Sequence, residues 1–538
     1  MFGNSKITSE QATIWKKWIP MVIFLFGIWY FCLRILGTGL EYIPGDFADS
    51  RFINYLLEHG ANWMWGKTNS FWNAPFMYPF QNTIGISDNM LGTMPIYAFF
   101  RSLGASNETA YQLWWILICS LNFWSAYLIL KRWFNRWDLA LIGAWIFAFT
   151  IFNLGQLNYV QMTIRFMVPI AIYASAKWVE TSKTKYFVIY SMALVYQFYC
   201  VIYTGFFLMY FTLGFMFLYA LTSKNYWFFT SLFKRSELKT SIPVIIISLL
   251  AMGWLMVPYW ETSKILGLRM YDEVKLNIPL WQSFLFPQES AQLWHSFSKW
   301  FKPNVETWWI HQSFPGMIPL VSIISIPIIW IVNKLKSKKL SPLALALTLT
   351  TFLIFILYIR TSSGYTLYVL LFKFPGMNSI RVIDRFMHVE LFFIIAAMIS
   401  LLLWLPKKYS LILLVLVFLD NAFVPERMVR RPKTELQARR EYTINEVKKF
   451  DFRNKTAFAI IDSLDYHNAV HIDAMIASDY LKTPTVNGYS SSGPSEFGAF
   501  FGTASESGLN LWLNCNHIAK EDILIIRRDS TKTILPAY

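Results

Sequence analysis

The stretch WIPMVIFLFGIWYFCLRIL, residues 18–36, decides the fold of this chain. An apolar run of roughly 17 to 22 residues is long enough to cross about 30 Å of hydrocarbon as a helix. Similar runs, three of them shorter, recur along the first 424 residues. We therefore expect an all-α, multi-pass membrane bundle with about eleven spans, at residues 18–36, 110–130, 138–152, 162–178, 186–200, 203–221, 241–260, 314–333, 342–360, 386–405 and 409–424.

The composition supports a membrane protein. The 538 residues are 55 % hydrophobic and 15 % charged, with a mean hydropathy of +0.38, which is not typical of a soluble globular protein. The net charge of +16 suggests nucleic acid at first sight. However, the excess basic residues lie in alternate short loops rather than on one surface, so we expect no nucleic acid partner.

The same charges predict the orientation. The segments assigned to the inside hold nineteen lysines and arginines against about four acids. The positive-inside rule then places the N-terminus in the cytoplasm, and eleven spans place the C-terminus outside. Three long loops, 37–109, 261–313 and 361–385, face outward, so we expect the working surface there.

Two units are expected. Residues 1–424 form the transmembrane domain, whose first outside loop, 37–109, carries surface helices. After residue 424 the hydropathy falls and the charges nearly balance. Residues 425–538 are therefore expected to form a small extracytoplasmic α/β domain, with strands at 457–461 and 523–526 and a helix at 467–482.

The first outside loop contains Gly45-Asp46-Phe47-Ala48-Asp49-Ser50-Arg51. Because Pro44 and Gly45 let the backbone turn tightly, the Asp46 carboxylate is expected at the outer rim of the first helix. A carboxylate partly shielded from water can take a proton from a hydroxyl group. Helix capping is the structural alternative for Asp46.

Other polar residues of the outside loops are candidates for substrate binding. Asp49 and Arg51 come from the same loop, and so does Asp88, although Ser87-Asp88-Asn89 is also typical of a helix N-cap. Gln156 and Gln161 lie between the third and fourth spans, and neutral amides suit sugar hydroxyls better than a metal ion.

Four basic or titratable residues suggest an anion site. Arg381 and Arg385 precede the tenth span on the outer side, where guanidinium groups suit a lipid-linked phosphate, and pairing with Asp384 is the alternative. Arg165 lies near the end of a span, so we expect it either to bind an anion or to form a structural pair within the protein. His311 faces the same cavity or lies on the surface.

In chain order these residues resemble the GT-C superfamily of integral-membrane glycosyltransferases, which use sugars carried on polyprenyl phosphate or diphosphate. The resemblance begins with the first helix, Gly45-Asp46, and the stretch Asp88…Pro95-Ile-Tyr97…Gly104…Ala110. It is closest to the bacterial multi-pass branch called YfhO-like, through Gly155-Gln156…Gln161, His311…Pro315-Gly316, Arg381…Arg385-Phe386 and Asn487-Gly488-Tyr489-Ser490.

The resemblance implies a function. Asp46 would be the base that activates the acceptor, and a positive outer pocket would bind the donor phosphate. The expected reaction transfers one sugar, with inversion, from a polyprenyl-phosphate donor to a glycan, lipid or protein acceptor. It would take place among the membrane lipids at the outer face of the bacterial cytoplasmic membrane.

The chain also departs from the family. Members that need a metal carry a further acidic motif in the second outside loop, where this chain has amides. Position 156, often histidine in related chains, is Gln. A metal-independent enzyme without a cofactor is therefore expected, although dependence on a divalent metal stays open. No protein metal site is expected, because His467 and His471 lack the glutamate of a zinc motif and a third ligand.

Two other function classes remain alternatives. A transporter or flippase also needs many spans, but transporters usually show paired halves and broken helices, neither of which the sequence indicates. A non-catalytic scaffold for cell-envelope glycans would use the bundle only as an anchor. That alternative predicts that Asp46→Asn is harmless.

Overall fold

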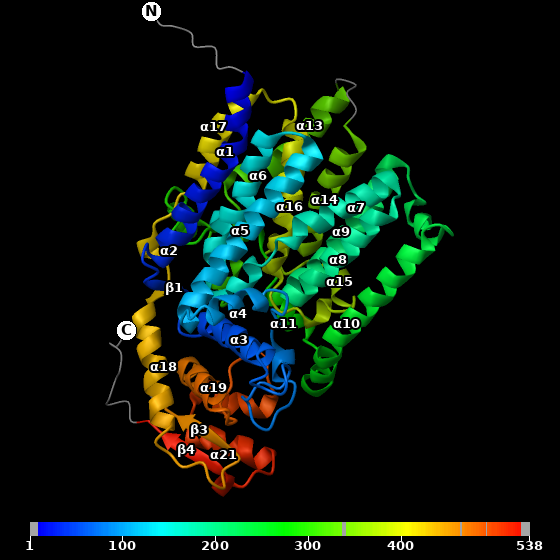
Figure 1. The fold of residues 1–538 in the computed structure, drawn as a ribbon. Coiled ribbons are helices and arrows are strands. Elements are labelled where there is room, and N and C mark those ends of the chain that lie inside the picture. The colour runs from blue at the N-terminus through cyan, green and yellow to red at the C-terminus, as the bar shows by residue number, and fades with distance from the viewer. Residues whose placement is uncertain (1–8, 336–339, 463–464, 491, 529–538) are drawn as a thin grey trace, which may run out of the picture.

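The computed structural model describes residues 9–335, 340–462, 465–490 and 492–528. Figure 1 shows a bundle of long helices, with a smaller group of helices and strands at one end. Helices occupy most of the eleven expected spans. They are α1 (Ser9–Gly27) continued by η1 (Ile28–Leu33) and α2 (Arg34–Leu36), then α5 (Asn107–Phe134), α6 (Trp137–Phe149), η3 (Ile151–Thr163), α7 (Met167–Thr181), α8 (Thr184–Cys200), α9 (Ile202–Ser223), α10 (Leu238–Leu266), α13 (Met317–Leu335), α14 (Pro342–Tyr358), α16 (Met387–Leu402) and α17 (Lys407–Asp420).

Within the described residues, five helices can cross a membrane by their length and composition. They are Trp18–Leu36, Asn107–Phe134, Ile202–Ser223, Leu238–Leu266 and Ile383–Leu402. The helices α6 and η3, bent by 48° at a short break, make a sixth if they are counted as one span. The protein is therefore a membrane-embedded helical bundle.

Polar residues at the helix ends set the turns of the bundle. The Ser106 hydroxyl accepts a hydrogen bond from the Thr109 N–H at the start of α5, and the Ser341 hydroxyl caps α14 in the same way. Asn135 and Ser182 end α5 and α7 in the left-handed conformation. These local signals explain why the helix bounds follow the apolar runs closely.

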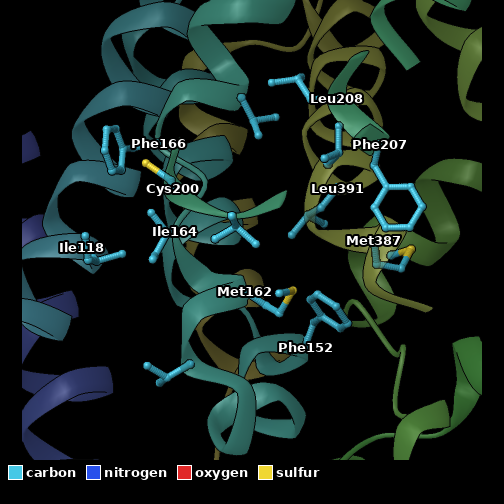
Figure 2. Close-up of a cluster of buried hydrophobic side chains, with 14 of the residues drawn as sticks. Ile118, Phe152, Met162, Ile164, Phe166, Cys200, Phe207, Leu208, Met387 and Leu391 are labelled. Carbon is cyan, nitrogen blue, oxygen red and sulfur yellow. The ribbon is translucent and has the colours of Figure 1, made fainter. Parts of the chain in front are cut away.

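The interior of the bundle is apolar. Figure 2 shows side chains of α5, η3, α9 and α16 meeting there. Ile118, Phe152, Met162, Phe207 and Met387 are each no more than 1 % exposed. The outside of the bundle is also apolar, since Ile247, Leu249 and Leu250 of α10 are 65 to 69 % exposed. Apolar residues on both sides are typical of helices that face lipid.

The first outside loop forms α3 (Asp49–Met64), η2 (Thr83–Ile86) and α4 (Met94–Ser102). Surface helices are expected in this loop. In the structure α3 lies between the bundle and α19 (His467–Leu481) (Figure 1), and most of its residues are buried. The short elements of the other outer loops are α11 (Tyr271–Leu276), η5 (Trp281–Leu285), α12 (His295–Trp300), η6 (Trp308–His311), α15 (Val369–Phe372), η7 (Met377–Ser379) and η8 (Ile383–Phe386).

The tail contains the expected strands and helix. Strands β3 (Ala457–Ile461) and β4 (Ile523–Arg527) pair in parallel, and α19 lies over the range predicted for it. The remaining tail elements include α18 (Lys433–Val447), α20 (Gly498–Thr503) and α21 (Glu506–Cys515). One pairing was not expected, because β1 (Tyr42–Pro44) of the first loop runs antiparallel to β2 (Arg430–Pro432). This pairing joins the first loop to the start of the tail.

Candidate functional site

Asp46 caps helix α3. Its Oδ1 accepts the backbone N–H groups of Ala48 and Asp49 at 2.9 and 3.1 Å. Gly45 precedes it with φ +95°, and a Cβ at this position would come within 1.8 Å of Ser50 Oγ, so the turn requires glycine. The capping role is therefore real. The Asp46 Oδ2 atom accepts no hydrogen bond from the described residues, so it is free to meet a substrate group.

Asp49 is the most perturbed carboxyl group of the first loop. Tyr489 Oη, from the tail, donates a 2.8 Å hydrogen bond to Asp49 Oδ1. Burial, and then the negative charge of Asp46, raise the pKa of Asp49 to about 6. Tyr489, Arg385 and Arg381 act in the opposite direction. A carboxyl group with this pKa exchanges its proton near neutral pH, as a general base must.

Arg381 precedes η8 and Arg385 lies within it, and both are close enough to Asp49 to affect its pKa. The Arg385 guanidinium lies over the rings of Tyr159 and Tyr203, at 4.8 and 5.0 Å from their centroids. Neither arginine side chain forms an ion pair or hydrogen bond with the residues described in the structure. The expected alternative, an ion pair with Asp384, is not formed. Two half-buried guanidinium groups without anionic partners are suited to bind a phosphate.

Asp88 belongs to the same region. Its Oδ1 accepts the backbone N–H of Ile202 at 3.2 Å, and Gln161 Nε2 lies 3.5 Å from its Oδ2. Asp88 therefore caps the start of α9 rather than the segment that follows it in sequence. Burial raises the pKa of Asp88, and the charge of Arg385 opposes this rise. Asp88 and Gln161 thus lie within the electrostatic reach of Arg385.

Gln156 lies beside Asp384. The Gln156 side chain is close enough to Asp384 to interact with it electrostatically, and Asp384 Oδ1 is buried without a hydrogen-bond partner among the described residues. Sequence reasoning treated Asp384 only as a partner for arginine, and it did not assign roles to Tyr159 and Tyr203. The available signal for Asp384 and Tyr159 was their position beside predicted site residues in the sequence, and Tyr203 had no such signal. The structure adds these three residues to the site.

Three predicted site residues lie elsewhere. Arg51 donates to Asp473 of α19 at 2.6 Å. Arg165 is fully buried, where it contacts Asn153 Oδ1 at 2.9 Å and His388 Nδ1 at 3.1 Å. The structural alternative therefore accounts for the position of Arg165.

His311 is also buried rather than on the surface. Its Nδ1 lies 3.1 Å from Ser283 Oγ. Burial, and then the charge of Arg360, lower the pKa of His311 to about 4. The imidazole is therefore neutral at pH 7, so it adds no positive charge to an anion site.

Carboxylates and histidines do not gather into a metal site in the described ranges. No group of three or more His, Cys, Asp or Glu side chains there has the arrangement to hold a metal ion. Asp46 and Asp49 are two neighbouring carboxylates, Arg381 and Arg385 lie close enough to affect the pKa of Asp49, and the Gln161 amide lies 3.5 Å from Asp88. This set of groups fits a hydroxylated, anionic ligand better than a bare cation.

Comparison of the sequence with protein-family models and with curated proteins gives no match. The class of the protein therefore rests on its own fold and site. It is a membrane-embedded helical protein with a carboxylate pair and, close to it, two arginines that have no anionic partner among the described residues.

Proposed function

We propose that this protein is a membrane glycosyltransferase of the GT-C type. It transfers a sugar from a polyprenyl-phosphate donor to an acceptor at the extracytoplasmic face of a bacterial cytoplasmic membrane. The observation that carries this proposal is the position of Asp46 and Asp49 beside Arg381 and Arg385, which have no anionic partner in the described structure. Transfer of a sugar from a phosphate leaving group requires a base that accepts the acceptor's proton and, next to it, positive groups that stabilise the departing phosphate.

Each residue has a defined role in the proposed reaction. Asp46 takes the proton of the acceptor hydroxyl through its free Oδ2, and the acceptor oxygen attacks C1 of the sugar. The bond between C1 and the phosphate oxygen breaks, and polyprenyl phosphate leaves with the bonding electrons. Arg381 and Arg385 stabilise the negative charge of the leaving phosphate.

Asp49 acts together with Asp46. The charge of Asp46 contributes to the raised pKa of Asp49. Protonation of Asp49 therefore sets the acid limb of the pH dependence of transfer. Asp88, Gln156 and Gln161 supply hydrogen bonds for sugar hydroxyls at the edge of the site.

The proposed topology has eleven passes, the N-terminus in the cytoplasm and the tail outside. Its support is the positive-inside pattern of the short loops and the helices that occupy most of the expected spans. The lipid chain of the donor would approach from the bilayer between helices, because its phosphate need only reach the headgroup level.

One observation favours the transporter alternative. The sequence indicated no broken helix, but α6 and η3 are separated by a short break and a bend of 48°. Discontinuous helices are common around transporter binding sites. A transporter would move its ligand across a vesicle membrane without forming a new product.

Purified protein in lipid nanodiscs, supplied with radiolabelled polyprenyl-phosphate sugars and envelope glycans, tests the proposal. The wild type is expected to release polyprenyl phosphate and label an acceptor, and Asp46→Asn to lose at least about 100-fold of this rate. Asp451→Asn, in an exposed tail carboxylate, is the matched control and should transfer normally. Uptake into vesicles without a labelled product would overturn the proposal in favour of transport.

A further inference from the structure

A polar cavity lies between the first loop and the tail. Its volume is about 490 Å³, and its walls come from α3, the start of α5, α18 and α19. Asp46, Asp49, Arg381 and Arg385 do not line it. The sequence predicted that Arg51 binds substrate. In the structure Arg51 lines this cavity and is not part of the site that contains Asp46 and Asp49.

Two buried donors line the cavity without a partner. Arg51 is 5 % exposed and Tyr55 is 3 % exposed, and Arg51 Nη1 and Tyr55 Oη have no hydrogen-bond partner among the described residues. The other end of the Arg51 guanidinium is held by Asp473 at 2.6 Å, which fixes its direction. Burial, and then the charge of Asp479, raise the pKa of Tyr55, so its hydroxyl remains a donor.

Buried donors of this kind are unfavourable until an acceptor reaches them. Burial of a polar group without a hydrogen bond is destabilising, so most such groups in folded proteins have partners. Both donors here require an oxygen acceptor. A ligand oxygen atom within the cavity would satisfy them.

The charges around the cavity favour an anion. Three of its lining carboxylates are already neutralised: Glu58 pairs with Arg101 at 2.8 Å, Glu108 with Arg440 at 2.5 Å, and Asp479 with Lys482 at 3.6 Å. The fourth, Glu441, is exposed.

Two lysines of the lining have no carboxylate partner in the described chain. Lys67 lies over the Trp65 ring at 4.5 Å, and Lys448 lies over the Tyr480 ring at 4.7 Å. Asn54 and Asn445 add amide groups, which can both donate to and accept from hydroxyls.

We propose that this cavity binds an acidic carbohydrate. Its oxyanion, a carboxylate or a phosphate, accepts hydrogen bonds from Arg51 Nη1 and Tyr55 Oη, and its hydroxyls meet the amides of Asn54 and Asn445. Insofar as it rests on the proposed function, this ligand is the acceptor glycan, because Arg51 and Asp49 lie two residues apart on α3. Binding itself does not depend on catalysis.

Isothermal titration calorimetry of the full chain tests the proposal with three probes: a galacturonic acid trisaccharide, glucose 1-phosphate and the neutral maltotriose. The first two distinguish a carboxylate from a phosphate ligand. We expect at least one of them to bind at least about tenfold more tightly than maltotriose. Tyr55→Phe should weaken this binding about tenfold, as expected for the loss of one hydrogen bond to a charged group.

Tyr55→Phe should not destabilise the protein, because the Tyr55 hydroxyl makes no hydrogen bond within the described chain. Tyr358→Phe removes a hydroxyl that is also buried without a partner but lies in α14, away from the cavity, and should bind like the wild type. Equal binding of maltotriose, no binding of either acidic probe, or unchanged binding by Tyr55→Phe would overturn the proposal. Asp46→Asn should still bind, so failure of the catalytic assignment and failure of this site are distinguishable.

Discussion

Tyr489 Oη donates a 2.8 Å hydrogen bond to Asp49 Oδ1, across 440 positions of sequence. The tail therefore contributes a side chain to the carboxylate pair of the first loop. Backbone hydrogen bonds support this contact, because Met77 and Tyr78 donate to the carbonyls of Asn487 and Thr485 at 3.0 Å. The tail is part of the candidate site, not only an attachment to it.

Replacing Tyr489 should change the protonation of Asp49. The hydrogen bond favours the ionised carboxylate, so Tyr489→Phe is expected to raise the pKa of Asp49 further above about 6. The acid limb of the rate–pH profile for sugar transfer should move to higher pH, by about half a unit or more. Tyr358→Phe serves as the control. An acid limb that stays in place would show that Asp49 does not contribute to the rate.

Asp49→Asn should stabilise the protein at high pH only. The raised pKa means that the fold favours the protonated group, so ionisation of Asp49 costs stability above pH 6. That cost disappears as the pH falls from about 6 to below the ordinary value of 3.8. The variant should gain about 1–2 kcal/mol of unfolding free energy at pH 8, allowing for partial exposure, and nothing at pH 3.5. Thermal unfolding at both pH values measures this, and an equal gain at pH 3.5 would argue against the raised pKa.

Arg385→Gln should weaken donor binding more than it weakens the fold. Arg385 has no ion pair within the described chain to lose, and its stacking on Tyr159 and Tyr203 contributes only about 1 kcal/mol. Loss of a charged contact to phosphate should raise the KM for the polyprenyl-phosphate donor about 10- to 100-fold.

A matched arginine separates these two effects. Arg136 pairs with Asp138 at 2.6 Å, far from η8 in the sequence, so Arg136→Gln should lower stability and leave the KM unchanged. If Arg385→Gln bound the donor as the wild type does, the proposed phosphate site would be in the wrong place.

We expect Asp473 to form the most stabilising single contact between the first loop and the tail. It is 1 % exposed and accepts hydrogen bonds from Arg51, Arg439 and Arg528 at 2.6, 2.9 and 2.9 Å. Asp473→Asn would leave these arginines without their shared anion, at a cost of about 3–5 kcal/mol in denaturant unfolding. The exposed Asp451→Asn should show no measurable change. A small change in the unfolding free energy of Asp473→Asn would mean that the three arginines find other hydrogen-bond acceptors.

The sequence predicted best those elements that depend on residues close together in the chain. Helices and strands depend on apolar patterns and caps within a few residues, so the helices and the strands at 457–461 and 523–526 could be predicted. Pairing across long sequence distances could not be predicted. No local pattern indicates that β1 pairs with β2, or that Tyr489 reaches Asp49.

Charged site residues show the same limit. Loop position predicted that Asp49, Arg381 and Arg385 lie together, because the expected topology puts all three at span ends on the same side, and both arginines are close enough to Asp49 to affect its pKa. Arg51 and Arg165 have similar sequence surroundings, yet Asp473 holds one and His388 and Asn153 hold the other. A charged residue's partners depend on the tertiary fold, so sequence alone cannot separate a binding arginine from a structural one.

The most direct measurement is the release of polyprenyl phosphate from a labelled polyprenyl-phosphate sugar by the wild type, Asp46→Asn and Asp46→Asn/Asp49→Asn in nanodiscs. A thermal unfolding measurement on each of the three proteins checks that it is folded in the nanodisc. We expect turnover by the wild type, a loss of at least about 100-fold in the single variant and no detectable release in the double variant. Equal release by all three proteins would contradict the assignment of the carboxylate pair as the catalytic base.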